Sequence, residues 1–158
     1  MAGQIFQINA SKGGVPKTPL RIAEVNELGI TVDQQRYTKV HGGPDKALCL
    51  YSVELIAALQ KEGHPIYAGA IGENLTTSGI DWQDMTIGSR WQIGSAVQIE
   101  ITSYAVPCNH IGPSFINKRS KRVHAEENPG WARTYARVLQ DGVIRLGDEI
   151  KPLPLEQA

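Results

Sequence analysis

The chain has 158 residues, a hydrophobic fraction of 41%, and 16 basic and 16 acidic side chains. This length and apolar content allow one domain with a substantial core and exclude an intrinsically disordered chain. The formal net charge of zero excludes a global field that would attract nucleic acid or an anionic membrane, so we expect neither as a partner.

The first residues lack the basic-then-apolar pattern of a secretory signal. No run approaches the ~18 apolar residues that a membrane span needs. We therefore expect a cytoplasmic protein. In that compartment the two cysteines, Cys49 and Cys108, are expected to be free thiols.

Glycine and proline punctuate the chain, with 16 and 9 residues respectively, which favours short strands joined by tight turns. In chain order, the apolar pattern predicts strands over 4–9, 20–25 and 29–32. A turn at 41–45 then leads into an apolar run that reaches residue 51.

The clearest helix is predicted over 52–62. Ser52 can serve as its N-cap, and Gly63 and Pro65 end it. One apolar face is expected from the side chains at four positions, namely Val53, Ile56, Ala57 and Leu59.

The second half of the chain is again rich in strand patterns. A strand signal covers 91–101, a short basic helix is expected over 114–122, and 131–139 alternates large and small side chains. Asp141-Gly142 is typical of a hairpin turn from which 143–146 returns, before a last strand. These elements predict a mainly β fold, a β-barrel or strongly curved sheet with one or two short helices, in a single domain over 3–153.

Cys108 follows Pro107 at the end of a predicted strand, where a thiol can face a cleft. A thiolate is both a nucleophile and a soft-metal ligand, whereas a buried structural cysteine fits the same position equally well. His110 could share a face with Cys108, but the histidine spacing and the lack of a CxxC motif argue against zinc. Nothing supplies the orienting group of a hydrolytic Cys–His site.

A turn-rich segment precedes the apolar run. The glycines of His41-Gly42-Gly43 allow backbone N–H groups to converge on an anion or on the edge of a heterocycle. Asp45 and Lys46 add groups that bind by charge or hydrogen bond. An ordinary hairpin turn explains the same composition.

Gly72-Glu73-Asn74 is a second candidate binding segment. The Asn74 amide carries donors and acceptors that suit a pterin or base edge, although a solvated turn is the better interpretation of this motif alone.

A third candidate is the loop containing Lys12, Gly13, Gly14 and Lys17, which partly resembles a phosphate-binding loop without Walker spacing. A basic run is best explained as a solvated face, with phosphate or nucleic-acid contact as the alternative; its members are Lys118, Arg119, Lys121 and Arg122.

These motifs occur in an order that resembles MOSC domains, the family named for the C-terminal domain of molybdenum cofactor sulfurases. The short stand-alone bacterial members, the YiiM-like proteins, are the most similar. The matching segments are 39–47, 72–75, Pro107-Cys108, 137–139 with Gly142, and Gly147-Asp148.

The resemblance implies a MOSC-type β-barrel that binds the pterin-based molybdenum cofactor (molybdopterin), with Cys108 as metal ligand and catalytic residue. Similar proteins such as the amidoxime reducing component reduce N-hydroxylated compounds. The same activity here would need an external reductase, a flavin or iron–sulfur protein. Pyridoxal phosphate binding is also associated with the family. The implied cofactor-binding residues are Lys12, Gly13, Gly14, Lys17, His41, Gly42, Gly43, Asp45, Lys46, Gly72, Glu73, Asn74 and Arg133.

One position departs from the family pattern. Many members carry an arginine three residues before the cysteine, where this chain has Ala105, so Arg133 or Lys17 would have to supply the positive charge. Two other functions stay open: a non-catalytic module that carries the cofactor or a sulfur on Cys108, and a structural barrel with an ordinary buried thiol.

Overall fold

The computed structural model describes residues 2–33 and 43–154. Within them the helices are α2 (Val53–Lys61) and short 3-10 turns at Pro44–Lys46, Trp82–Asp84, Asn109–Ser114, Ile116–Lys118 and Ser120–Val123. The strands are β1 (Gly3–Ala10), β2 (Thr18–Leu20), β3 (Ile22–Asn26), β4 (Gly29–Ile30), β5 (Leu48–Ser52), β6 (Leu75–Ser78), β7 (Arg90–Ile93), β8 (Val97–Tyr104), β9 (Thr134–Gln140), β10 (Gly142–Arg145) and β11 (Glu149–Leu153).

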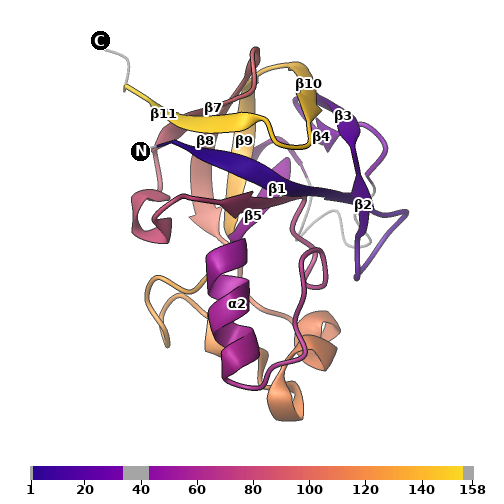
Figure 1. The fold of residues 1–158 in the computed structure, drawn as a ribbon, viewed down its shortest axis with the longest axis vertical. Coiled ribbons are helices and arrows are strands. Elements are labelled where there is room, and N and C mark those ends of the chain that lie inside the picture. The colour runs from indigo at the N-terminus through magenta and orange to yellow at the C-terminus, as the bar shows by residue number, and fades with distance from the viewer. Residues whose placement is uncertain (1, 34–42, 155–158) are drawn as a thin grey trace.

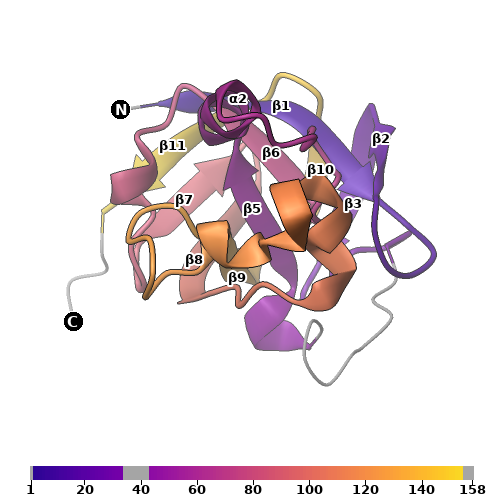
Figure 2. The ribbon, with the colours of Figure 1, turned by 90° about the horizontal axis from the view of Figure 1, so that it is seen from below.

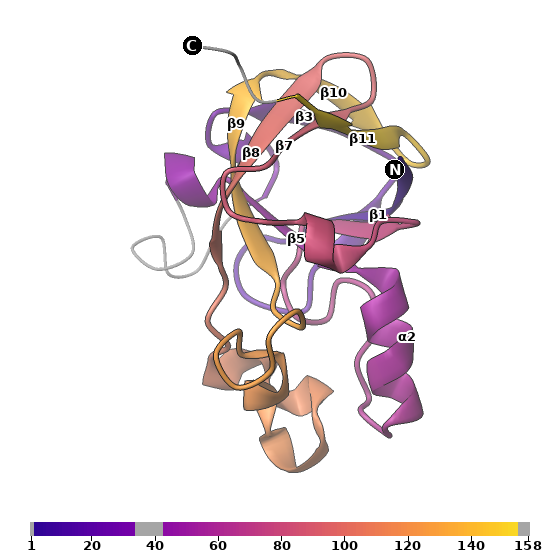
Figure 3. The ribbon, with the colours of Figure 1, turned by 90° about the vertical axis from the view of Figure 1, so that its left-hand side faces the viewer.

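The larger sheet closes on itself. Its strand order is β11-β7-β8-β9-β5-β6-β1, and β1 pairs back with β11 through Gly3 opposite Ile150. The pairs are antiparallel except β5 with β6, and β2 extends the sheet beside β1. Figure 3 shows these strands running around a common interior. The predicted mainly β barrel is confirmed, as a closed barrel of seven strands.

The predicted hairpin at Asp141-Gly142 is wrong. β10 pairs with β3 in a separate sheet, with Gly142 opposite Val25, and does not pair with β9. β8 pairs along one edge of β9, and β5 pairs with the other edge only at 134–136. A single residue separates β9 from β10, which is too short for the predicted two-residue hairpin turn. Gly142 serves close packing, because a Cβ there would lie 2.8 Å from the Cβ of Ala96.

The strand signal over 91–101 is divided into the antiparallel pair β7 and β8. The chain reverses next to Gly94, whose φ of +65° lies in the left-handed region that glycine tolerates. The alternation still holds, since Trp91 pairs with Ile99 and Ile93 with Val97, and all four side chains are buried. Together with Ile8, Leu50 and Leu75 they belong to the barrel core.

Helix α2 confirms the predicted helix and its cap. The Ser52 hydroxyl accepts a hydrogen bond from the Leu55 backbone N–H at 3.2 Å. Ile56 and Leu59 are buried, whereas Ala57 is exposed and does not belong to the packed face.

The basic segment 114–122 forms no regular helix. Three 3-10 turns occupy 109–123 instead, because Pro113 lies inside the first turn and Asn117 and Lys118 have positive φ angles of 54° and 57°. Figures 1 and 2 show these turns and α2 on the same end of the barrel. No helix in the described residues is long and apolar enough to cross a bilayer.

Candidate functional site

Cys108 lies beyond the barrel strands. β8 ends at Tyr104, and the chain then runs extended to the 3-10 turn that begins at Asn109. The Cys108 side chain is half-buried, and its Sγ lies 3.6 Å from Nδ1 of His110, with the donor set by the histidine tautomer. The predicted Cys108–His110 proximity is therefore present, although on a turn and not on a strand face.

The segment before Cys108 is held against the start of β9. The backbone N–H of Ala105 donates to the carbonyl oxygen of Arg133 at 2.8 Å. Ala105 is 1% exposed and packs with Cys49 and Tyr135. Arg133 therefore lies just before β9, and its backbone is bonded to Ala105, the position where many MOSC members carry an arginine.

Arg133 is a buried cation with hydrogen-bonding capacity to spare. Its side chain donates from Nη1 to the carbonyl oxygen of Ile71 at 2.8 Å and is 4% exposed as a residue. Its Nε and Nη2 groups have no hydrogen-bond partner in residues 2–33 and 43–154. A buried guanidinium with open donors favours a bound anion or acceptor at this place.

The charge of Arg133 acts on neighbouring buried groups, including Cys49 and Tyr135. Burial raises the pKa of the Cys49 thiol to about 11, and the positive charge of Arg133 opposes this rise. Burial also raises the pKa of Tyr135 above its usual range, with a further rise from Cys49 and an opposing effect from Arg133. Cys49 is consequently held as a neutral thiol, which leaves Cys108 as the more accessible sulfur.

Glu73 and Asn74 lie in the interior, so the interpretation of their motif as a solvated turn is wrong. The Asn74 side-chain oxygen accepts from the Cys49 N–H at 2.9 Å, and its amide nitrogen donates to Oδ2 of Asp33 at 2.8 Å. These two bonds link β5 to the segment after β4.

The Glu73 carboxylate is only half satisfied. Its Oε2 accepts from the Gly69 N–H at 3.0 Å and from the Thr76 hydroxyl at 3.1 Å. Its Oε1 is buried and has no hydrogen-bond partner in the described part of the chain. Burial accordingly raises the pKa of Glu73, with the two hydrogen bonds and Arg133 acting in the opposite direction.

Lys17 is buried against Asp33. The Lys17 ammonium lies 2.7 and 2.8 Å from the two Asp33 oxygens, and Oδ1 of Asp33 also accepts from the Ser11 N–H at 2.9 Å. Asp33 was not among the predicted site residues, since it is an isolated carboxylate after a short strand and no local motif marks it. Lys17 is thus already neutralised inside the protein.

The Ser11 side chain closes the glycine loop next to Lys17 by hydrogen bonds within the loop. Ser11 Oγ accepts from the Gly13 N–H at 3.2 Å and donates to the Gly14 carbonyl oxygen at 2.9 Å, while Lys12 is exposed. Gly72 adjoins this loop, because a Cβ there would lie 3.0 Å from Cγ1 of Val15.

The turn Pro44–Lys46 packs on β9. Nζ of Lys46 lies 5.3 Å from the ring centroid of Tyr135, and Oδ1 of Asp45 lies 3.4 Å from Nη2 of Arg137. Gly43 precedes this turn, is exposed and has φ +92°. His41 and Gly42 lie outside the described residues.

Three of the predicted residues, Lys17, Glu73 and Asn74, belong to one buried polar network. Direct hydrogen bonds and an ion pair join them to Asn9, Asp33 and Thr76. Arg133, Glu73, Lys17 and Asp33 all act on the pKa of Cys49, which places their charges around this thiol. Lys12 is exposed, and no hydrogen bond or ion pair within the described residues links it to Cys108.

The residues present fit an anionic metal cofactor in two respects. Cys108 offers one half-buried soft ligand, and Arg133 offers two open buried N–H groups. A molybdenum cofactor brings its own dithiolene sulfurs, so one protein thiolate suffices. In the described residues no three His, Cys, Asp or Glu side chains gather into a metal site.

The fold is thus a small closed β-barrel, with Cys108 beyond the end of β8 and a buried polar network. The MOSC domain family model matches residues 37–151, so the chain belongs to the MOSC domain family. This family is associated with molybdenum cofactor binding.

Three relatives show how the chain compares in length. Protein YiiM of Escherichia coli (strain K12) is 28% identical over 142 residues, which span 85% of this chain and 63% of YiiM. The uncharacterized protein YflK of Bacillus subtilis (strain 168) is 31% identical over 72% of this chain and 50% of YflK. A protein named reductase from Gibberella moniliformis (strain M3125 / FGSC 7600) is 31% identical over 72% of this chain and 20% of its own length. The chain therefore spans about half to three fifths of the two bacterial proteins.

Solved structures share the fold. The crystal structure of YiiM from Geobacillus stearothermophilus superimposes with a TM-score of 0.74 at 28% identity, covering 96% of this chain and 75% of that one. The YUAD protein of Bacillus subtilis has a TM-score of 0.73 at 18% identity, with 96% of both chains covered, and shows the fold alone.

Proposed function

We propose that this chain binds the molybdenum cofactor and reduces N-hydroxylated small molecules with electrons from an external flavin or iron–sulfur reductase. The observation that carries the proposal is the combination of an accessible thiol at Cys108 with the buried, partly unpaired guanidinium of Arg133. Its family membership and a relative named reductase support the same class of reaction.

The reaction consumes two electrons and two protons, cleaves the N–O bond, and releases the amine or amidine with water. When bound, the cofactor would supply the metal centre that takes the oxygen atom. Cys108 would hold the metal through its sulfur, and the open N–H groups of Arg133 would hold an anionic or carbonyl part of the cofactor.

His110 is the group best placed to handle a proton near Cys108. Its Nδ1 lies 3.6 Å from the sulfur, so it can orient the thiolate or hold a proton on the substrate side. The Lys17–Asp33 pair and Asn74 would not contact the cofactor directly, because their polar atoms already bind one another. They fix the backbone that carries Cys49 and the β1–β2 loop.

The test is an activity assay of protein purified from a host that makes the cofactor, with an N-hydroxylated purine base as substrate and a chemical reductant in place of the unknown donor. We expect amine formation by the unsubstituted protein and loss of at least about 100-fold in Cys108→Ser. Cys49→Ala, the matched control at the buried thiol, should keep most activity.

Two results would separate this function from the alternatives. Cofactor bound with no turnover under any reductant would favour a non-catalytic carrier. Equal activity of the unsubstituted protein and Cys108→Ser would contradict a role for this thiol in the reaction.

A further inference from the structure

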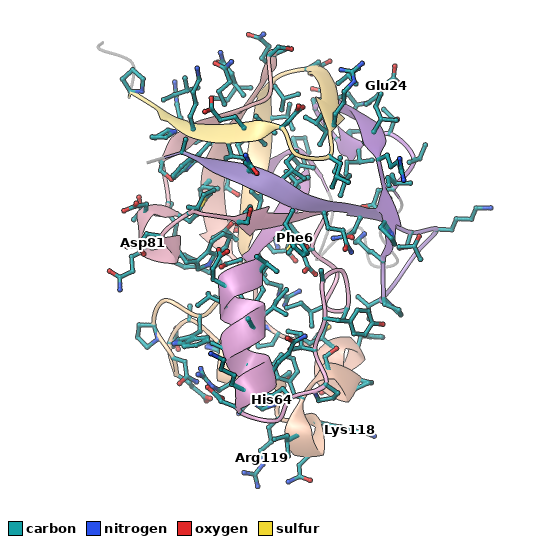
Figure 4. All side chains as sticks on the ribbon, viewed as in Figure 1. Phe6, Glu24, His64, Asp81, Lys118 and Arg119 are labelled. Atoms are coloured by element: carbon teal, nitrogen blue, oxygen red, sulfur yellow. The ribbon has the colours of Figure 1, made fainter. Side chains whose placement is uncertain are left out.

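A pocket of about 620 Å³ lies where the 3-10 turns of 109–123 meet the end of α2. Figure 4 shows three of its lining residues, His64, Lys118 and Arg119, close together beyond the end of the helix. Its volume is in the range of small-molecule sites. The basic run that the sequence suggested to be a solvated face therefore lines a concavity.

The pocket keeps an excess of positive charge. Arg122 is neutralised by Glu62 through two bonds of 2.9 and 2.7 Å, and Lys121 lies 3.9 Å from Glu127. For Lys118 and Arg119, no carboxylate in the described residues lies within ion-pair distance. In a chain of zero net charge, two unpaired cations at consecutive positions that line the same pocket attract anions locally.

Packing and hydrogen bonds fix two of the lining residues, Arg122 and Asn128. The Arg122 guanidinium lies 4.0 Å from the ring centroid of Trp131, and its pairing with Glu62 fixes the plane. The Asn128 amide donates to the carbonyl oxygen of Lys121 at 3.3 Å. Lys118 and Arg119 therefore lie in a pocket whose other side chains are held by specific contacts.

The backbone next to Lys118 has an unusual conformation and is closely packed. Asn117 and Lys118 have consecutive positive φ angles, 54° and 57°, which only a well-packed surrounding maintains. A Cβ added at Gly112 would lie 3.2 Å from the Cβ of Lys118, so the root of this lysine packs closely on the preceding turn. The Ile116 N–H, which donates to Nδ1 of His64 at 3.1 Å, ties the segment to the end of α2.

We propose that this pocket binds a phosphorylated small molecule of about nucleotide size. Its phosphate dianion would lie between Lys118 and Arg119, and its polar organic part would contact the side-chain amides of Asn109, Asn117 and Asn128. The concave shape and the neutral overall charge favour a small ligand over an extended polyanion. Asn109 follows Cys108 directly in the chain, but this proposal does not rest on the proposed reaction, and its test does not depend on the cofactor.

The test is isothermal titration calorimetry of the full chain with adenosine monophosphate, adenosine and inorganic phosphate as probes. We expect saturable binding of the monophosphate that weakens with added salt, weaker binding of inorganic phosphate, and no binding of adenosine. Lys118→Asn combined with Arg119→Gln should weaken monophosphate binding at least about tenfold. Asparagine is chosen at 118 because it tolerates the positive φ.

Lys151→Gln is the matched control, since this exposed lysine lies on β11 in the barrel and not in the pocket. It should bind the monophosphate like the unsubstituted protein. The proposal is overturned if the unsubstituted protein shows no saturable binding, if adenosine or inorganic phosphate binds as tightly as the monophosphate, or if the control loses as much affinity as the double variant. Circular dichroism confirms that each variant is folded.

Discussion

Lys17 and Asp33 form a salt bridge inside the protein, with side-chain exposures of 7% and 2%. A buried pair contributes little beyond what a well-packed apolar pair would, but removal of one partner leaves an uncompensated charge. Asp33 also accepts hydrogen bonds from Ser11 and Asn74, so its carboxylate holds three segments together.

We expect Asp33→Asn to lower the free energy of unfolding by about 3 kcal/mol, because the Lys17 ammonium stays buried without its counter-charge. Adding Lys17→Met should restore part of this loss, which urea unfolding of both variants measures. Glu100→Gln is the control, since it breaks pairs with Arg90 and Arg137 whose side chains are all partly exposed, and each pair should cost under about 1 kcal/mol. A cost as small in Asp33→Asn would contradict the buried-charge account.

Glu73 gives a pH-dependent prediction. Its pKa in the folded protein is raised by burial above the ordinary value of 4.5, so the folded state keeps a proton that the unfolded state loses. The stability that Glu73 contributes is thus complete below pH 4.5 and is lost as the pH rises through the folded-state pKa.

We expect Glu73→Gln to remove this dependence, since a neutral amide carries no ionisation cost. The stability of the unsubstituted protein relative to the variant should fall as the pH rises above the ordinary carboxyl value of 4.5, as measured by urea unfolding at a series of pH values. Parallel profiles for the two proteins would show that Glu73 ionises in the folded state as it does in the unfolded state.

At the scale of elements, Gly29 in β4 shows how closely the smaller sheet approaches Ala47, the residue before β5. Its φ is +107°, and a Cβ would overlap the carbonyl oxygen of Ala47. Gly88 has a similar φ of +92°, and no atom lies within 4 Å of an added Cβ. A substitution at Gly88 therefore measures the free-energy cost of the backbone conformation without a steric clash.

We expect Gly88→Ala to cost about 1–2 kcal/mol from the left-handed conformation alone. Gly29→Ala should cost at least about 2 kcal/mol more, because the Ala47 carbonyl must move. Thermal or urea unfolding of the two variants measures the difference. Equal losses of unfolding free energy in the two variants would mean that the Ala47 backbone moves aside without a measurable cost.

The elements show which parts of the fold local patterns can predict. Ser52 and the apolar positions Ile56 and Leu59 specify helix α2 within a few residues, so its prediction is confirmed. The turn signal at Asp141-Gly142 is equally local, but β10 pairs with β3, which comes from a distant part of the chain. Strand partners are long-range choices that a turn motif does not contain.

At the scale of the whole molecule, the order of the motifs predicted the MOSC family, and the family match confirms it. The order did not predict that Glu73 and Asn74 are buried, since polar residues after a glycine suggest a solvated turn until the barrel closes over them. Asp33 and the pocket at 109–128 depend on contacts between remote segments, for which the sequence carries no spacing signal. The roles of Cys108 and of the cofactor-binding residues stay predictions.

The central claim is that Cys108 holds molybdenum. Elemental analysis of molybdenum per polypeptide, on protein purified from a cofactor-producing host, tests it most directly. We predict near-stoichiometric metal in the unsubstituted protein and in Cys49→Ala, and at least about a tenfold loss in Cys108→Ser. Equal molybdenum content in Cys108→Ser and the unsubstituted protein, or no molybdenum in either, would contradict the account.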